Sequence, residues 1–485
     1  MIEAWATDDV RAAEAALMAE LPDGELMARA AEGLAQVALA RLTERGGSAV
    51  VALVGPGNNG GDTLYAAAHL ADRGFAVAAV RADWPVHESG LARAQASGVI
   101  VTEPGGRQWK QLLAEADLVL DGILGIGGRP GLPEQAIAWV EAIPDDAYVL
   151  AVDLPSGQDP AGETATPEAV FADETVTFGV PKPVHLLPAT EAAVGRLTVV
   201  DIGLAVDRAP AVQRVTRDDV PRLWPVPSAG DDKYSRGVLG IVAGGEQYTG
   251  AALLCTTAAV CSGVGMVRYV GTATPTALVR SGVPEAVIGT GQVQAWVVGP
   301  GLDVAATAHG ARQREAARAA LGSDLPVLVD AGGLDLVERP RQAPTLLTPH
   351  AGELARLISR LTGEEVSRKD VAASPVAHAR RAADVTGATV LLKGSTTLVV
   401  APTERGLPVR SQTDAPAWLA TAGAGDVLAG LAGTLLAAGL APIDAGSLAA
   451  LVHGVAADEA NPGGPVRALA VAHGIPGAVA GLLTR

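Results

Sequence analysis

The sequence predicts an α/β protein with two consecutive domains, of which the first is a doubly wound parallel sheet. At 485 residues the chain is too long for one ordinary hydrophobic core. Short apolar runs alternate with helical segments along most of the chain, which is typical of parallel sheets covered on both faces. Nearly half of the residues are apolar and only 18% are charged, so well-buried globular domains are expected.

The first domain is expected to cover residues 1–212. Its first 46 residues predict two helices laid against the sheet, the second with the sequence ELMARAAEGLAQVALARL. Residues 204–230 lose the periodicity and contain four prolines, so the boundary is placed near residue 212. Between residues 49 and 203 the runs follow in the order AVVALVG, TLYAAAHLADRG, FAVAAVRA, ARAQASG, DLVLDGILG, AIAWVEAI, YVLAVDLPSG, ETVTFG and RLTVVDIG.

The alternation resumes in a second domain, residues 216–485. The string VGPG occurs at residues 54 and 298, but different residues follow it, so no internal repeat is inferred. The runs are VLGIVAG, a small-residue helix AALLCTTAAVCSG, VRYVG, AWVVGPG, LPVLVDAGG, TLLTPH, ATVLLKG, TLVVA and a Gly/Ala-rich helix.

Charge and cysteine content narrow the class of protein. The formal net charge of −17 disfavours nucleic acid and anionic membranes as partners, because phosphate backbones are bound mainly by Lys and Arg. The two cysteines, Cys255 and Cys261, indicate neither a disulfide framework nor a metal site. No basic leader and no charge-free apolar run of about 20 residues occurs. We therefore expect a cytoplasmic enzyme that acts on small molecules.

The segment VGPGNNGGD, residues 54–62, joins the first expected strand to a helix. Its glycines satisfy the G-x-G-x-x-G pattern of dinucleotide-binding turns, with Asp83 about 20 residues further on. The match is weak, because a phosphate cradle needs neither the proline nor the two asparagines, and no Walker-type Lys-Ser/Thr follows. A purely structural alternative is that Asp62 caps the following helix.

Two later strand ends also carry polar side chains. Asp121 ends the run DLVLDGILG, and Asp153 and Ser156 follow the run VLAVDLPSG. Because the carboxyl ends of parallel strands converge on one crevice, these side chains and Asn59 are expected to meet there. They would offer hard oxygen ligands for an alkali or alkaline-earth cation and a carboxylate for proton transfer. Each aspartate alone could be a cap, but together they favour a site.

The motifs NNGGD, DGILG and VDLPSG, with TFGVPKP after them, resemble the NAD(P)H-hydrate epimerase (YjeF N-terminal) family across nearly all of residues 1–212. The resemblance implies a Rossmann-like domain with a potassium ion held by Asn59, Asp121 and Ser156. Ile126 stands where the family usually has Thr, which puts one phosphate or ribose contact in doubt. The residues implied to bind hydrated NADH or NADPH are Asn58, Asn59, Gly60, Gly61, Asp62, Gly125, Ile126, Gly127, Gly128, Arg129, Pro130, Gly131 and Asp153.

In the second domain, the segment ATAGAGDVLAGLAGTLLAAG predicts a helix that begins at a Gly-rich turn. Free N–H groups and the helix dipole near Gly423 and Gly425 can hold a phosphate or a developing oxyanion. Asp426 follows at once, and a carboxylate there can take the proton from a hydroxyl that attacks a terminal phosphate. The alternative, a small-residue helix packed in a core, explains the alanines but not the GAGD start.

Three further stretches fit the same site: DKYSRG, TLLTPHAGE with His350, and VLLKGSTT with Lys393. Alone, His350 could equally be a buried core histidine. With GPG and VDAGGL, these motifs resemble the NAD(P)H-hydrate dehydratase (YjeF C-terminal, carbohydrate-kinase-like) family over residues 216–485. The resemblance implies a ribokinase-like fold in which hydrated NAD(P)H lies near Ala251, Gly301, His350 and Asp426. It also implies a nucleotide bound by Lys393, Gly394, Ser395, Thr396, Thr397 and Gly425.

The two resemblances together predict a bifunctional repair enzyme. The first domain would interconvert the R and S epimers of hydrated NAD(P)H, with Asp153 as the acid/base group. The second would dehydrate the S form with Asp426 as the base, at the expense of ADP with magnesium, giving AMP and phosphate. We also expect a homo-oligomer. Two rival hypotheses are an ATP-dependent sugar or vitamin kinase with a Rossmann-like regulatory domain, and a non-enzymatic NAD(P)-sensing module; the residues do not separate ADP from ATP.

Overall fold

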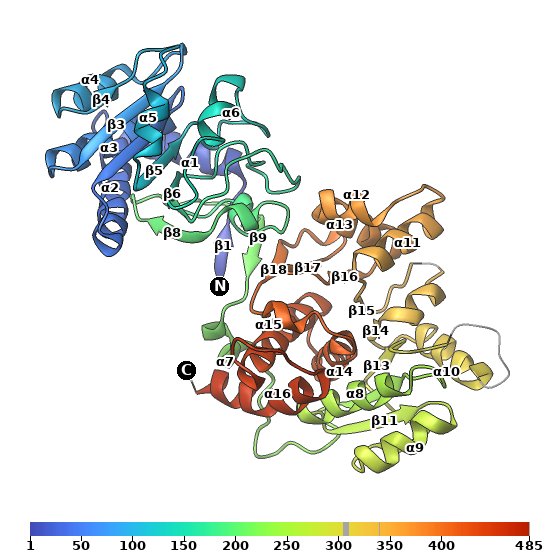
Figure 1. The fold of residues 1–485 in the computed structure, drawn as a ribbon. Helices are drawn as coiled ribbons and strands as arrows, with labels where there is room; N and C mark the ends of the chain where they lie inside the picture. Colours follow the sequence, from blue (N-terminus) through green and yellow to red (C-terminus); the bar gives the residue numbers. More distant parts are fainter. Residues whose placement is uncertain (304–309, 339, 485) are drawn as a thin grey trace. The chain divides into compact units, whose positions relative to one another are not determined.

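The computed structural model describes residues 1–303, 310–338 and 340–484. By its internal contacts the chain divides into two compact units, one spanning Glu3–Val212 and the other Gln213–Arg485 with Met1–Ile2. Each unit is built on its own β-sheet with helices packed against it (Figure 1). The predicted α/β class is confirmed. Among the described residues, no helix is long and apolar enough to cross a membrane.

The first unit has a seven-stranded sheet in the order β4-β3-β2-β5-β6-β7-β8, and every pairing in it is parallel. The strands are β2 (Ala49–Val54), β3 (Ala76–Arg81), β4 (Ile100–Val101), β5 (Leu118–Gly122), β6 (Tyr148–Val152), β7 (Glu174–Phe178) and β8 (Arg196–Val200). The helices are α1 (Thr7–Glu20), α2 (Glu25–Arg45), α3 (Asn58–Asp72), α4 (Glu88–Ala96), α5 (Trp109–Ala114) and α6 (Glu134–Val140).

Strand β2 shows why these strands read as unbroken apolar runs. Successive side chains of a strand point to opposite faces of the sheet. Val50 and Val54 join the core beneath α2 and α3, whereas Val51 and Leu53 join the core beneath α5 and α6. Because both faces are covered, no position along the strand is free for a polar residue.

The second unit has a mixed sheet that ends with strands β9 and β1 (Ile2–Ala4), of which Glu3, Ala4 and Val212 are counted with the first unit. The order is β1-β9-β18-β17-β16-β15-β14-β13-β10-β11-β12. The strands are β9 (Val212–Arg214), β10 (Val238–Val242), β11 (Met266–Val270), β12 (Val287–Ile288), β13 (Ala295–Val298), β14 (Val327–Val329), β15 (Thr345–Leu347), β16 (Thr389–Leu392), β17 (Thr397–Val400) and β18 (Val409–Gln412). The helices are α7 (Val220–Leu223), α8 (Thr249–Cys261), α9 (Ala273–Gly282), α10 (Ala311–Leu321), α11 (Ala351–Thr362), α12 (Arg368–Ala373), α13 (Pro375–Thr386), α14 (Ala424–Ala437), α15 (Pro442–Ala460) and α16 (Ala468–Leu483).

Strands β10 to β16 pair in parallel, whereas β16-β17 and β17-β18 are antiparallel. Strand β18 was not predicted from the sequence, because its residues Arg410, Ser411 and Gln412 are polar and nevertheless buried. Gln412 accepts a hydrogen bond from Val215 N at 2.9 Å and donates one to Val215 O at 3.0 Å. Such pairing removes most of the cost of burying an amide side chain.

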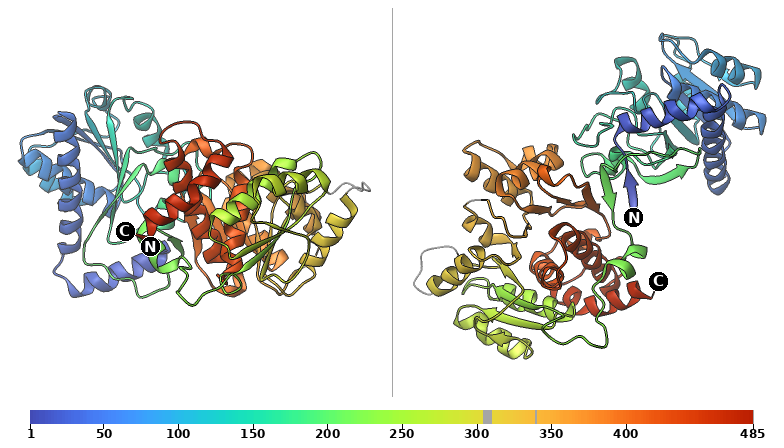
Figure 2. Two further views of the ribbon diagram at one scale, coloured as in Figure 1. Left: turned by 90° about the horizontal axis from the view of Figure 1, so that it is seen from below. Right: turned by 180° about the vertical axis from the view of Figure 1, so that it is seen from behind.

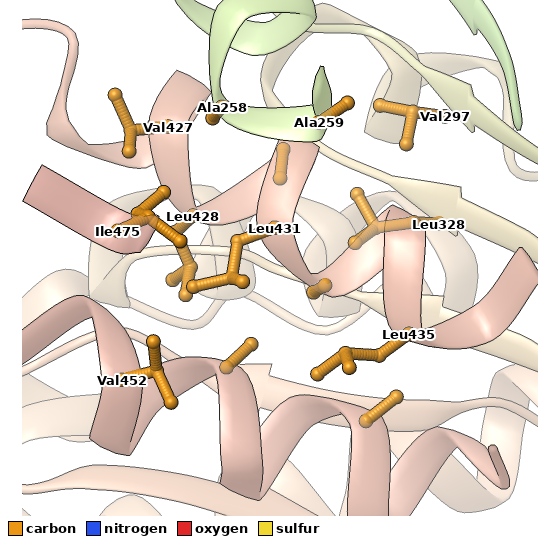
Figure 3. Close-up of a cluster of buried hydrophobic side chains, with 14 of the residues drawn as sticks. Ala258, Ala259, Val297, Leu328, Val427, Leu428, Leu431, Leu435, Val452 and Ile475 are labelled. Carbon is orange, nitrogen blue, oxygen red and sulfur yellow. The ribbon is translucent and has the colours of Figure 1, made fainter. Parts of the chain in front are cut away.

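Helix α14 lies at the centre of the core of this unit (Figure 3). It packs against α8, α15 and α16. In the two further views of Figure 2, the red C-terminal helices lie beside yellow-green segments of the same unit. A Cβ on Gly430 would lie 2.2 Å from Cys255 O, and one on Gly433 would lie 2.3 Å from a methyl of Val297. The small residues therefore let α14 approach α8 and the sheet closely, so the close-packing interpretation holds for the body of this helix.

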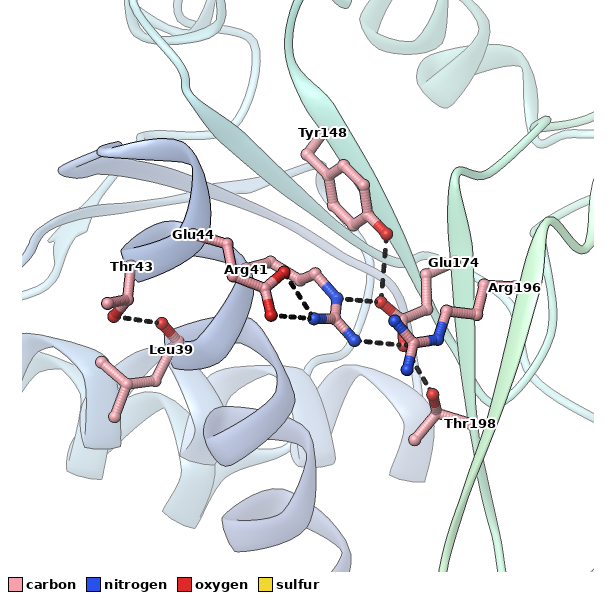
Figure 4. Close-up of polar contacts among 8 residues, drawn as sticks. All are labelled: Leu39, Arg41, Thr43, Glu44, Tyr148, Glu174, Arg196 and Thr198. Carbon is pink, nitrogen blue, oxygen red and sulfur yellow. Dashed lines mark hydrogen bonds and ion pairs between the residues drawn. The ribbon is translucent and has the colours of Figure 1, made fainter.

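A buried polar network ties α2 to the sheet of the first unit (Figure 4). Arg41 of α2 donates hydrogen bonds to both carboxylate oxygens of Glu174 on β7, at 2.6 and 3.3 Å. The Glu174 side chain is fully buried and also accepts hydrogen bonds from Tyr148 at 3.0 Å and Thr198 at 2.5 Å. Removing the Arg partner of a buried carboxylate is strongly destabilising, because it leaves an uncompensated charge in the interior.

Replacing Arg41 by Ala should lower the free energy of unfolding of the first unit by about 3–5 kcal/mol, because the Glu174 carboxylate stays buried without its cation. The loss would be measured by urea unfolding of the first unit, with hydrogen exchange of the β7 amides as the probe. Arg196→Ala is the matched control: Arg196 is mostly exposed and lies 3.9 Å from Glu174, so its loss should cost less than about 1 kcal/mol. Equal effects of the two variants would contradict this account.

Candidate active sites

The segment NNGGD forms the first turn of helix α3 in the structure. Gly57 is the N-cap residue with φ 82°, and the helix begins at Asn58. The expected binding loop over Asn58–Asp62 is therefore helical. Asp62 lies inside the helix, so the alternative in which it serves as the helix cap is wrong. Gly60 and Gly61 are buried in this turn.

Two glycines allow this turn to press against the end of β5. A Cβ on Gly55 would lie 1.7 Å from Ile123 O, and one on Gly60 would lie 2.0 Å from Gly55 O. Contacts of that length cannot be relieved by moving a side chain, because the partner atoms belong to the backbone. The glycines of this motif thus bring the chain after β2 into contact with the chain after β5.

Asp121 and Ser156 meet at the carboxyl edge of the sheet. Ser156 N donates a hydrogen bond to Asp121 Oδ2 at 2.8 Å, and Ser156 Oγ accepts one from Leu124 N at 2.8 Å. Burial raises the pKa of Asp121 to about 6. Asn59 lies against Gly125, and its Nδ2 is buried without a hydrogen-bond partner among the described residues. The buried carboxyl of Asp121 and the hydroxyl of Ser156 are oxygen ligands of the kind that a cation takes. The unpaired Nδ2 of Asn59 is a hydrogen-bond donor, so it suits an acceptor atom of a ligand, and only the Oδ1 of this amide could contact a cation.

The loop after β5 is held to its neighbours through its backbone. Gly131 N donates a hydrogen bond to Gly157 O at 2.8 Å, and Ile126 O accepts one from Arg11 of α1 at 2.5 Å. Gly128 N donates a hydrogen bond to Gly125 O within the loop. The atypical residue Ile126 therefore takes part through its carbonyl. The remaining predicted loop residues, Gly127, Arg129 and Pro130, are exposed.

Asp153 follows β6 with φ 68°, a conformation that non-glycine residues rarely adopt. Its Oδ1 is 2.6 Å from the Nζ of fully buried Lys182 and accepts a hydrogen bond from Thr177 at 3.0 Å. Burial alone would raise the pKa of Asp153, but the Lys182 ammonium outweighs it, so the pKa lies below its usual value.

His185 fixes the backbone of this pair. Its Nδ1 accepts a hydrogen bond from Lys182 N at 2.9 Å, so its Nε2 donates to Asp153 O at 2.8 Å. Burial, with the nearby Lys182 charge, lowers the pKa of His185 to about 4. The imidazole is therefore neutral at pH 7, and its two hydrogen bonds connect the backbone of Lys182 to the backbone of Asp153.

A cavity of about 460 Å³ opens near this pair, and it is lined in part by Phe178, whose carbonyl accepts a hydrogen bond from Lys182 Nζ at 3.1 Å. Its walls come from α1, α2 and the first turns of α3, and include Glu14, Asn58, Asp62, Tyr65 and His87. Burial raises the pKa of both Glu14 and Asp62, and the charge of Asp153 adds to the shift. Sequence reasoning missed Glu14, because an acidic residue on an amphipathic helix ordinarily faces solvent.

The second unit gathers three chain segments around Asp426. Gly423 is the N-cap of α14 with φ 88°, so Asp426 lies in the first turn. Lys393 follows β16, and its Nζ is 2.8 Å from Oδ1 of Asp330, which follows β14. A Cβ on Gly425 would lie 3.3 Å from Lys393 Nζ. Burial, and next the charge of Asp330, raise the pKa of Asp426 to about 7.

Ala251 and Gly301 lie side by side, since a Cβ on Gly301 would be 2.6 Å from that of Ala251. Cys255 is one turn beyond Ala251 on α8, and its pKa is raised by burial and by the charges of Asp426 and Asp330. The face of α8 that carries Ala251 is therefore next to the Asp426 cluster.

His350 is the N-cap of α11 and its side chain is 55% exposed, so the core-histidine alternative is wrong. Its Nδ1 accepts hydrogen bonds from the backbone N–H groups of Gly352 and Glu353 at 3.0 and 3.3 Å. It adjoins Lys393, because Lys393 N donates to Pro349 O at 2.9 Å. Its Nε2 lies 3.6 Å from Oε1 of Glu353, in the first turn of the same helix.

The hydroxyl-rich segment after Lys393 forms the β16-β17 turn. Gly394 and Ser395 are exposed, Thr396 is buried and Thr397 begins β17. Sequence reasoning missed one neighbour, His453 of α15, whose Nε2 is buried with no hydrogen-bond partner among the described residues. Burial, with the charge of Lys393, lowers the pKa of His453 to about 4.

Comparison with known proteins covers both units. A family model described as NAD(P)H-hydrate dehydratase matches residues 239–470, and one described as YjeF-related protein N-terminus matches residues 23–184. The bifunctional NAD(P)H-hydrate repair enzyme Nnr of Mycobacterium leprae is 44% identical over 475 residues, covering 94% of this chain and 93% of the relative. The chain belongs to the family of bifunctional NAD(P)H-hydrate repair enzymes.

A second bifunctional relative and a solved structure are also similar to this chain. The repair enzyme of Mycobacterium tuberculosis (strain H37Rv) is 45% identical over 456 residues, covering 90% of this chain and 89% of that protein. A crystal structure of the ADP/ATP-dependent NAD(P)H-hydrate dehydratase from Bacillus subtilis, co-crystallised with ATP and Mg²⁺, is 25% identical with a TM-score of 0.49. It covers 56% of this chain and 99% of the Bacillus chain.

Replacing Lys182 by Met should destabilise the first unit by about 3–5 kcal/mol at pH 8, because it leaves the buried Asp153 carboxylate without a cation. The loss should shrink toward pH 5. In the variant the folded pKa of Asp153 rises above the unfolded value of about 3.9, so protonation removes the buried charge. Urea unfolding at the two pH values would test this. Lys110→Met, at an exposed lysine, should have little effect at either pH.

Proposed function

We propose that the first unit epimerises the R and S forms of hydrated NADH and NADPH, and that the second unit dehydrates the S form back to NAD(P)H with consumption of ADP. The observation that carries this proposal is the 44% identity to a bifunctional repair enzyme over 94% of the chain. The two clusters of buried charged side chains, one in each unit, support it, because both lie at strand or helix ends where parallel sheets bind ligands.

In the second unit, Asp426 is the proposed general base. A carboxylate with a pKa of about 7 can take up a proton at neutral pH. It would deprotonate the C6 hydroxyl of the hydrated nicotinamide, whose oxygen then attacks the terminal phosphorus of ADP, releasing AMP. Loss of phosphate from C6 and of a proton from C5 restores the ring double bond. Phosphorylation makes a good leaving group out of hydroxide, which is why kinase-like geometry suits a dehydratase.

The other predicted residues of the second unit have supporting roles in this proposal. The N–H groups at the start of α14, at Gly425, would bind phosphate oxygens as charge moves onto them. Lys393 is held by Asp330 in reach of the same place and would neutralise the phosphate. Residues Gly394 to Thr397 would border the nucleotide, and Ala251, Gly301 and His350 the hydrated ring. Magnesium bound with ADP would lower the charge of the phosphates.

In the first unit, the turn from Asn58 to Asp62 and the loop from Gly125 to Gly131 would bind the dinucleotide substrate. Asp153, kept ionised by Lys182, would accept a proton during epimerisation. Asn59, Asp121 and Ser156 would hold potassium, which would supply positive charge for the substrate pyrophosphate or ring. The homo-oligomeric state and the cytoplasmic location stay predictions, the first of which light scattering would check.

The repair activity can be tested by incubating the protein with chemically hydrated NADPH and ADP, and following the return of dihydronicotinamide absorbance. Asp426→Asn should abolish recovery. Asp153→Asn should recover the S-epimer share rapidly and the remainder only at the spontaneous epimerisation rate. Failure to recover absorbance with either ADP or ATP would overturn the proposed function, and accumulation of a stable phosphorylated product would favour a kinase instead.

The proposed potassium site predicts a cation effect confined to epimerisation. Replacing K⁺ by a bulky organic cation such as tetramethylammonium at constant ionic strength should slow conversion of the R epimer at least about tenfold and leave dehydration of pure S epimer unchanged. Asp121→Asn should abolish this potassium response, because it removes the one buried carboxylate of the set. An epimerisation rate independent of the cation would argue that these residues are only structural.

A further inference from the structure

The cavity beside Asp153 contains a carboxyl group for which the proposed function has no role. Glu14 projects from α1 into the wall of this cavity, together with Asp62 from α3. Glu14 makes no hydrogen bond or ion pair with another of the described residues. It is nevertheless near the Asp153-Lys182 pair, because Phe178, which also lines this cavity, accepts a hydrogen bond from Lys182 Nζ at 3.1 Å. The charges of both Asp153 and Lys182 also act on the pKa of Glu14.

The two carboxyl groups have opposite surroundings. Asp153 Oδ1 is in direct contact with an ammonium and a hydroxyl, which favour its ionised form. Glu14 has no such contact and is partly withdrawn from water, which favours its protonated form. A pair of carboxyl groups pushed to opposite protonation states beside one cavity is the arrangement that general acid–base catalysis uses.

We propose that Glu14 is a catalytic residue of the first unit, the general acid that delivers a proton to the C6 hydroxyl of the hydrated nicotinamide. This inference rests on the proposed epimerase function and adds a second acid/base group to it. Sequence motifs do not mark Glu14, because it lies on α1, far along the chain from the strand ends that carry the other polar groups.

The proposed step balances without an external reagent. The proton of Glu14 goes to the hydroxyl oxygen, the C6–O bond breaks, and the lone pair of the ring N1 forms a C6=N1 iminium while water leaves. A water molecule then adds to the opposite face of C6, and Asp153 accepts its proton. Return of that proton from Asp153 to Glu14 through water resets the site. The net change is inversion at C6, with one solvent oxygen exchanged for the original hydroxyl oxygen.

The test uses the full-length protein and purified R epimer of hydrated NADPH, without nucleotide, with both epimers resolved by chromatography. Glu14→Gln should lower kcat for epimerisation about 100-fold or more, with KM changed less than about threefold, because the isosteric amide cannot donate the proton. Glu14→Asp should restore part of the rate. Wild-type protein in ¹⁸O-labelled water should place one label at C6 for each inversion.

Glu20→Gln is the matched control, because it removes the same charge from an exposed position on the same helix. It should leave kcat unchanged. Urea unfolding of the first unit reports that it is folded, dehydration of pure S epimer with ADP reports the same for the second unit, and both should be equal in all variants. A Glu14→Gln variant with wild-type kcat would overturn the role of Glu14 while the repair function stands, as would inversion without ¹⁸O uptake. A wild-type protein that does not epimerise would instead overturn the proposed function of the first unit.

Discussion

Each unit depends on an ion pair between a lysine and an aspartate that follows a β-strand. These pairs are Lys182 with Asp153 in the first unit and Lys393 with Asp330 in the second. The two lysines are among only five in the sequence, in which most basic residues are arginines. A carboxylate at a strand end is withdrawn from water by the helices on both faces of the sheet, and a nearby cation offsets the free-energy cost of keeping it charged. Lysine supplies a compact charge on a long stem, which suits these narrow edges.

The two units use aspartate in opposite ways. Asp153 is matched by Lys182 and keeps its charge, so it can act as a proton acceptor as soon as substrate binds. Asp426 lies near Asp330, whose own charge is already paired with Lys393, and its pKa rises to about 7. Asp153 is thus ionised at neutral pH, whereas Asp426 has a pKa close to neutral pH. The difference arises because the lysine contacts Asp153 directly in the first unit but contacts Asp330, the neighbour of Asp426, in the second.

Small residues decide how closely these groups can be assembled. Gly55 lets the chain before α3 touch the chain after β5, and Gly60 lets the first turn of α3 approach Gly55. Gly430 and Gly433 let α14 pack closely against α8 and the sheet. In both places a single Cβ would overlap backbone or core atoms. The glycine-rich composition therefore reflects close backbone approach at the sites, in addition to turns. Close packing also explains why the helix that begins at GAGD has two roles: its body is part of the core, and its N-terminus is the expected phosphate-binding site.

The sequence by itself determined the α/β class, the parallel strands and the family, because apolar runs, turn residues and short motifs are local properties. It also indicated Asp121 and Ser156 as neighbours, since strand ends converge in any parallel sheet. It did not reveal strand β18, whose buried polar side chains pair with distant backbone, or that NNGGD is helical. Only the tertiary structure brought Glu14 beside Asp153 and Asp330 beside Asp426. Protonation state depends on such neighbours and on burial, and both exist only after the chain has folded.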